Sequence, residues 1–183
     1  MLGRMEDPAD WLGTPDRAGG GAFFDTGTHL VDLMHYWFGR PTAVTGTMKR
    51  LVVSQEKKGE DTAVVTYEFG DDLVVNLTVS YAVENEPWSE KKFIYGTGGD
   101  LSIISEAVVP MFFVSGGRPE MPEVEHQADW WPWSHDLVLR HFVEVILENS
   151  EPMVTAEDAR EALRSIEYAY VSAREGRRVD MGV

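Results

Sequence analysis

The chain has 183 residues, of which 43% are hydrophobic, and carries a formal net charge of −15 at pH 7. This length and apolar content suffice for a buried core, which excludes a wholly disordered chain. Because nucleic acids and anionic membrane surfaces are bound mainly through Lys and Arg, the acidic excess argues against both as partners. The absence of cysteine removes disulfides and thiolate chemistry.

The N-terminal region is predicted to be irregular over residues 1–22, where prolines and the run Gly19-Gly20-Gly21 interrupt any regular pattern. Its first residues lack the apolar segment of a signal peptide. No stretch approaches the roughly 20 apolar residues that span a bilayer. We therefore expect a cytoplasmic location.

A helix is predicted over residues 26–38. It has one apolar stripe at helical spacing, formed by Leu30, Leu33, Met34, Trp37 and Phe38. Asp25 or Thr26 is expected to cap its start, and Gly39 followed by Pro41 to end it.

Strands are predicted from residue 42 to residue 114. Residues 61–69 and 73–81 alternate in polarity around the turn Gly70-Asp71-Asp72, which predicts a β-hairpin. Its second face carries no charge from Val74 to Ala82, so we expect this face to meet another subunit. Further strands are expected at 42–53, 93–95, 101–104 and 108–114.

A loop is predicted over residues 116–134, followed by helices at 135–148 and 156–175. The stripe of the first is Val138, Phe142, Val145 and Ile146, and that of the second is Ala159, Ala162, Leu163, Ile166, Ala169, Tyr170 and Ala173. Thr155 and Asp158 have the spacing of a capping box, and Gly176 ends the second helix. The order of elements predicts an α+β fold, with an open, mostly antiparallel sheet and helices on one face. We expect one domain over 1–183.

The best polar constellation lies at the start of the helix at 26–38. Asp25, His29, Asp32 and Tyr36 fall within about 60° of one another on a helical wheel. A carboxylate one turn from an imidazole can orient it for proton exchange with a hydroxyl. The preceding glycines permit close backbone approach, and a helix start favours an anionic or polar ligand. A capping aspartate with a structural histidine is the alternative.

The segment from Gly19 to Asp32, with Trp37-Phe38-Gly39 and the upstream Trp11, resembles a signature of the Gfo/Idh/MocA oxidoreductases. Two further segments are similar to the same family. They are Ile94–Leu101, like its G-T-x-G turn, and Phe142–Arg177, like its closing helices.

The resemblance implies an enzyme that holds NAD or NADP in an N-terminal Rossmann domain. The domain seen here would carry the substrate site and form oligomers through its open sheet. His29 would be the general acid/base, taking the hydroxyl proton as hydride leaves the same carbon. Asp25 would position the substrate or His29. Asp32 and Tyr36, on the same helical stripe, are further candidates for substrate binding, and a structural role is the alternative favoured for Asp32.

Two family features have no counterpart in the sequence. No dinucleotide fingerprint is present, since Gly96-Thr97-Gly98-Gly99 is flanked by strands on both sides. Glu90-Lys91-Lys92 lacks the proline of the family's Glu-Lys-Pro motif. We therefore expect a substrate-binding and oligomerisation domain that needs a Rossmann domain in cis or in trans and is inactive alone. A stand-alone binding or assembly module is the alternative, and a relative with non-redox output stays open.

Weaker signals lie near the loop at 116–134. Trp131, within Trp130–Trp133, is a candidate for stacking on a sugar ring, although core or subunit contacts are the commoner use of tryptophan. His135 and Glu144 lie about 180° apart on a helical wheel, which disfavours a metal site. We expect a sugar or polyol as substrate, no resident metal and a homo-oligomer.

Overall fold

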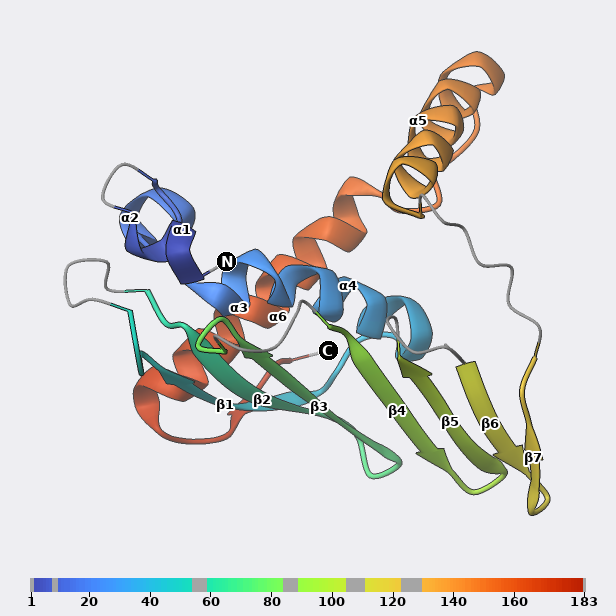
Figure 1. The fold of residues 1–183 in the computed structure, drawn as a ribbon, viewed down its shortest axis with the longest axis horizontal. Coiled ribbons are helices and arrows are strands. Elements are labelled where there is room, and N and C mark those ends of the chain that lie inside the picture. Colours follow the sequence, from blue (N-terminus) through green and yellow to red (C-terminus); the bar gives the residue numbers. More distant parts are fainter. Residues whose placement is uncertain are drawn as a thin grey trace. The chain divides into compact units, whose positions relative to one another are not determined.

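A computed structural model describes residues 2–7, 10–53, 59–83, 89–104, 111–122 and 130–182, without the side chains of Leu2, Glu6, Trp130 and Trp131. The chain divides into two compact units, one of Met1–Glu84 with Met153–Val183 and one of Asn85–Pro152 (Figure 1). Each unit contains one four-stranded antiparallel sheet. The predicted α+β class with open antiparallel sheet structure is confirmed, and its strands are shared between two sheets.

The sheet of the first unit has the order β3-β2-β1-β8. Its strands are β1 (Ala43–Lys49), β2 (Thr62–Phe69), β3 (Leu73–Ser80) and β8 (Val179–Asp180). The predicted hairpin is confirmed, because β2 and β3 pair around a turn in which Gly70 has a φ of 60°. Ala63, Val65 and Tyr67 are fully buried on the inner face of β2, as the alternation predicts.

Two helices, α4 (Gly27–Phe38) and α6 (Ala156–Glu175), pack on this sheet (Figure 1). The approach of α6 to β1 is close, since a Cβ on Gly46 would lie 2.7 Å from the Ala169 carbonyl oxygen. The Gly46 N–H donates to Ser172 Oγ at 3.0 Å, and Tyr67 Oη donates to the Ser165 carbonyl at 3.0 Å. These bonds fix α6 on β1 and β2.

The predicted ends of α6 are confirmed. Thr155 and Asp158 form a reciprocal capping box, and Gly176 adopts the left-handed conformation with a φ of 64°. The predicted stripe is only partly right. Its buried members are Ala162, Ile166 and Ala169, whereas Leu163 is 40% exposed and the polar residues Glu161, Ser165 and Ser172 are buried instead.

The N-terminal region departs from its prediction as irregular. It contains α1 (Leu2–Glu6) and α2 (Pro15–Ala18), and α3 (Ala22–Asp25) precedes α4. The predicted cap at Asp25 or Thr26 is wrong, because Thr26 has helical backbone angles and makes no capping bond. Both side chains bond to Tyr81 instead. The stripe of α4 is also shifted, with Val31 and Met34 buried and Trp37 partly exposed.

The second unit has a sheet of order β4-β5-β6-β7. Its elements are β4 (Lys91–Gly96), β5 (Gly99–Ile104), β6 (Met111–Ser115), β7 (Arg118–Glu120) and α5 (Trp130–Glu148). The loop predicted at 116–134 is therefore wrong in part, because Gly116 and Gly117 have positive φ and turn the chain into β7. Val138, Phe142 and Ile146, predicted to be a buried stripe, are exposed on α5. None of the described helices is long and apolar enough to cross a membrane.

Candidate functional site

The glycine turn before α3 is held by a buried glutamate from the start of β2. The Gly21 N–H donates to Glu60 Oε2 at 3.0 Å and the Phe23 N–H to Glu60 Oε1 at 2.9 Å. The Ala22 N–H donates to the Glu60 carbonyl oxygen at 2.8 Å. From α6, Tyr170 Oη donates to Glu60 Oε1 at 2.8 Å. Glu60 therefore caps α3 from 39 residues away in sequence.

The glycines of this turn are required by protein groups. A Cβ on Gly21 would lie 2.0 Å from the Glu60 carbonyl oxygen, and one on Gly20 would lie 2.1 Å from Tyr170 Oη. The backbone N–H groups of Gly21, Ala22 and Phe23 are all bonded to Glu60, so they are not free to bind a ligand. The polar-ligand site predicted at the start of the helix at 26–38 stays a prediction. No local pattern in the sequence indicates the contact with Glu60.

Asp25, the last residue of α3, is bonded to a buried tyrosine that follows β3. Tyr81 Oη donates to Asp25 Oδ2 at 2.6 Å and also shares a hydrogen bond with Thr26 Oγ1. Burial, together with donation to the carboxylate, raises the pKa of Tyr81 well above its usual value, so its hydroxyl stays protonated. Sequence reasoning placed Tyr81 in the apolar row of β3 and missed this contact.

A cation from α1 lies near the same carboxylate. Arg4 Nε donates to Asp10 Oδ2 at 2.8 Å, and this bond is the main cause of a raised Arg4 pKa. The negative charge of Asp25 raises the same pKa further. Arg4 is thus a second residue of this region that the sequence did not indicate, because its segment was predicted to be irregular.

The other predicted site residues lie along α4. His29 is exposed, and its backbone N–H donates to the Thr26 carbonyl oxygen at 3.2 Å. Asp32 is half-buried, and Tyr36 is 70% exposed. Among the described contacts, the hydrogen bond of the Asp25 carboxylate goes to Tyr81 and not to His29. Asp25 ends α3, and His29 lies four residues later in the first turn of α4.

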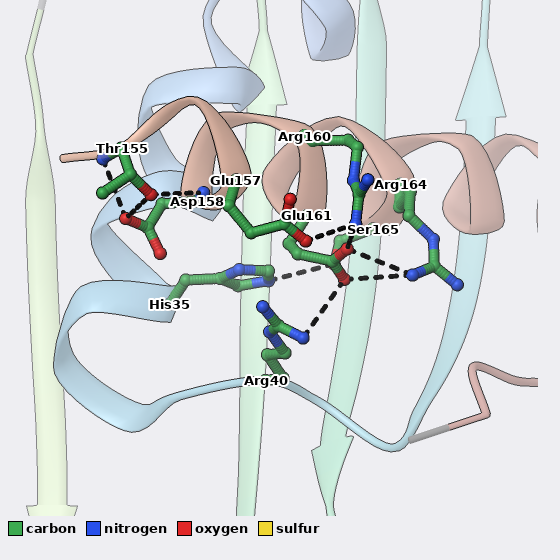
Figure 2. Close-up of polar contacts among 9 residues, drawn as sticks. All are labelled: His35, Arg40, Thr155, Glu157, Asp158, Arg160, Glu161, Arg164 and Ser165. Atoms are coloured by element: carbon green, nitrogen blue, oxygen red, sulfur yellow. Dashed lines mark hydrogen bonds and ion pairs between the residues drawn. The ribbon is translucent and has the colours of Figure 1, made fainter.

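His35, on α4, joins a polar cluster with α6 (Figure 2). His35 Nε2 lies 2.9 Å from Ser165 Oγ. Burial lowers the pKa of His35, an effect that the charge of Asp32 opposes. Next to it, the Glu161 carboxylate pairs with three guanidinium groups, those of Arg40 at 3.7 Å, Arg160 at 3.4 Å and Arg164 at 3.1 Å. These contacts fasten α4 to α6, which makes the cluster structural.

An open hollow of about 480 Å³ is lined in part by the glycine turn. Its lining residues are Pro15, Gly19, Gly20, Met48, Lys49, Arg50, Glu60, Tyr170, Ala173 and Arg174. None of the predicted site residues lines it. The hollow therefore does not contain the carboxylate and imidazole predicted for the site, whereas the region around Asp25 contains both.

Within the described ranges, the residues do not fit a nicotinamide dinucleotide. Gly96 to Gly99 connects β4 and β5 as a tight antiparallel turn, whereas a dinucleotide cradle joins a strand to a helix. The amides that start α3 are taken by Glu60. The same described ranges also contain no cluster of three His, Cys, Asp or Glu residues suited to a metal ion.

Trp131 and the lysines near β4 belong to the second unit. The side chain of Trp131 lies outside the described residues, so its predicted contact with a sugar stays a prediction. Lys92 Nζ pairs with Glu90 at 2.6 Å at the start of β4. Glu90-Lys91-Lys92 therefore enters a strand, as the sequence indicated.

Residues 2–181 match the family described as "Oxidoreductase family, C-terminal alpha/beta domain" of the Gfo/Idh/MocA proteins. The chain belongs to this family. The family resemblance predicted from the sequence is thereby confirmed, and the match extends over nearly the whole chain.

Relatives of this Gfo/Idh/MocA domain include D-apiose dehydrogenase from Paraburkholderia graminis, 26% identical over 168 residues that cover 86% of the chain and 44% of the relative. Aldose-aldose oxidoreductase from Caulobacter crescentus, complexed with glycerol, is 28% identical and has a TM-score of 0.77, with 95% of the chain and 51% of that structure covered. The WlbA dehydrogenase from Bordetella pertussis, in complex with NADH and UDP-GlcNAcA, shares the fold at 20% identity, with a TM-score of 0.78 and coverage of 97% and 52%. The chain thus spans about half the length of these relatives.

Proposed function

We propose that the chain is the substrate-binding domain of a nicotinamide-dependent oxidoreductase acting on a CH–OH group of a sugar or polyol. The observation that carries the proposal is the Asp25 carboxylate, held by Tyr81 at the start of α4, with the exposed His29 imidazole one turn further on. Both residues lie in the block that resembles the family signature. The names of relatives, a D-apiose dehydrogenase and an aldose-aldose oxidoreductase, support a hydroxyl-rich substrate.

In this proposal Asp25 accepts a hydrogen bond from a substrate hydroxyl and His29 takes the proton of the hydroxyl that is oxidised. An exposed imidazole can exchange a proton with a bound hydroxyl. Asp32 and Tyr36 are assigned to outer contacts with the sugar, and the stacking of Trp131 on a sugar ring stays a prediction from the sequence. The nicotinamide cofactor, NAD or NADP, would be held by a separate Rossmann domain in cis or in trans.

The outer face of β2 and β3 supports the second part of the proposal, a cytoplasmic homo-oligomer formed through this sheet. Val64 and Val74 are 41% and 64% exposed on that face, beside uncharged Asn76 and Thr78. Glu68, opposite Val74 and paired with Arg178, is a charged group at one end of this face, so its uncharged part is centred on Val64. An exposed apolar surface of this kind is typical of a protein contact. The same face favours the second candidate, an assembly module without catalysis.

The test has two arms. The chain alone is titrated with NAD⁺ and NADP⁺ by calorimetry, and we expect no binding at millimolar cofactor. The chain joined to its dinucleotide-binding domain is then assayed for cofactor reduction with D-apiose, D-glucose and myo-inositol. We expect His29→Gln to lower kcat by about 10²- to 10⁴-fold, whereas His141→Gln, on α5, leaves kcat unchanged. Equal turnover of His29→Gln and wild type would remove the catalytic assignment. Absence of turnover with the full sugar and polyol panel would favour the assembly module.

A further inference from the structure

Asp25 lies at the end of a helix too short to hold its own position. α3 has four residues, and an isolated helix of that length is unstable in water. Its first amides are fixed by Glu60, which is only 8% exposed. Its last residues are fixed by Tyr81, which is 4% exposed. Contacts from outside the helix therefore set the position of Asp25.

Both supports come from one point of the sheet. Glu60 and Asp61 are adjacent, and the Tyr81 N–H donates to the Asp61 carbonyl oxygen at 2.8 Å. This bond extends the β2–β3 register one step beyond the pair Thr62 and Ser80. The Asp61 carboxylate is itself fixed, because its Oδ2 accepts the N–H groups of residues 51, 52 and 53 at 2.8–3.0 Å. Tyr81 thus has a rigid backbone.

The Tyr81 hydroxyl contacts only one side of the carboxylate. It donates to Asp25 Oδ2, and Oδ1 has no hydrogen bond to any described residue. An aspartate has only two side-chain torsions, so fixing one oxygen limits where the other can lie. Oδ1 is then the oxygen left to accept from a ligand hydroxyl. The hydrogen bond to Thr26 Oγ1 ties the same hydroxyl to the residue that links α3 to α4.

We infer that Tyr81 is the positioning residue of Asp25, presenting Oδ1 to the substrate and fixing the junction of α3 with α4. The inference rests on the proposed role of Asp25 in substrate binding. Tyr81 acts through Asp25 and does not exchange a proton with the substrate. Removing its hydroxyl loosens the carboxylate while the aromatic ring continues to fill the core.

The first test needs no activity. Hydrogen–deuterium exchange is measured on the 183-residue chain for wild type, Tyr81→Phe and Tyr67→Phe. Tyr67 is the matched control, since it is also buried and donates one hydrogen bond, to the Ser165 carbonyl. In Tyr81→Phe we expect the amides of Asp25 and Thr26 to exchange about tenfold faster relative to those of β5, a strand that neither substitution touches. In Tyr67→Phe that ratio stays at the wild-type value. An unchanged ratio in Tyr81→Phe overturns the inference.

The second test separates positioning from general support. In the chain joined to its dinucleotide-binding domain, Tyr81→Phe is expected to lower kcat/KM by about 10- to 100-fold. In an Asp25→Ala background the same change should cost less than about twofold, because the carboxylate that accepts from Tyr81 is already gone. Equal losses in both backgrounds overturn the inference. If the wild-type enzyme turns over no sugar or polyol, the proposed function fails, while the exchange ratio still decides the role of Tyr81.

Discussion

The Glu60 carboxylate and the Gly21 backbone N–H, 39 residues apart in sequence, form a buried hydrogen bond of 3.0 Å. The same carboxylate accepts from the Phe23 N–H and from Tyr170 Oη, so one side chain joins β2, α3 and α6. These contacts lie at the start of α3, the helix that ends at Asp25. They therefore help to set the position of the Asp25 carboxylate.

Glu60→Ala should lower the free energy of unfolding by about 3–5 kcal/mol, because two amides and a tyrosine hydroxyl lose a buried acceptor. Urea denaturation of the chain, followed by tryptophan fluorescence, measures the change. Glu157→Ala, at an exposed position of α6, is the control and should change stability by less than about 1 kcal/mol. Similar losses for the two variants would show that the Glu60 contacts carry little stability.

Gly21→Ala should prevent the turn from forming, because the added methyl would meet the backbone of Glu60, which cannot move aside without shifting β2. We expect a loss of more than about 3 kcal/mol or failure to fold, read by circular dichroism and thermal unfolding. Gly98→Ala is the matched control, since nothing lies within 4 Å of its added methyl. A stable Gly21→Ala protein with unchanged Asp25 exchange would contradict the close approach.

The free energy of unfolding should fall in mild acid, because His35 is partly buried beside Ser165. Burial lowers the folded-state pKa of His35 below its ordinary value near 6.5, so the unfolded chain binds this proton more readily. The contribution is complete above about pH 6.5 and is lost as the pH falls through the lower, folded pKa. Asp32, Arg40 and Glu161 surround the ring and set the residual charge effects.

Denaturation of wild type and His35→Gln at pH 7.5 and pH 5.5 tests this point. The Gln amide keeps a hydrogen-bonding group near Ser165 but does not titrate. The variant should therefore lose less stability than wild type between the two pH values. An equal or larger loss in the variant would assign the acid sensitivity to other groups.

Val64→Lys should weaken self-association if the outer face of β2 and β3 is the subunit contact proposed above. Val64 lies between the uncharged Thr47 and Thr78 on the neighbouring strands, so a lysine there must be desolvated without a cross-strand partner, which disfavours the assembled state. Sedimentation velocity at several concentrations measures the change, with Leu163→Lys, an exposed apolar position on α6, as control. An unchanged sedimentation coefficient for Val64→Lys, or a monomeric wild type, would place the contact elsewhere or remove it.

Local patterns in the sequence predicted those parts of the fold that depend on neighbouring residues. The β2–β3 hairpin follows from alternation around Gly70, and the cap of α6 follows from Thr155 and Asp158 three residues apart. The division of the strands into two sheets was not predictable, because alternation identifies a strand without naming its partner. Family resemblance identified Asp25 and His29 because they lie in one contiguous block.

The two residues that hold α3 and Asp25 in place, Glu60 and Tyr81, are not marked by any local sequence pattern. Glu60 follows a polar segment and reads as part of a solvated loop, and Tyr81 reads as the last apolar residue of its strand. Their partners lie 39 and 56 residues away, so only the folded chain brings them together. The glycine run was correctly read as a place of close approach, but the approaching groups belong to the protein.

Tyr170 belongs to the last helix of the chain, 149 residues after the glycine turn that it contacts. During synthesis on the ribosome, the turn therefore waits for 149 further residues before this partner emerges. Until then Glu60 lacks one of its donors and the sheet of the first unit lacks the helix that covers β1. The region before Asp25 is thus completed only after α6 has been synthesised, long after its own residues.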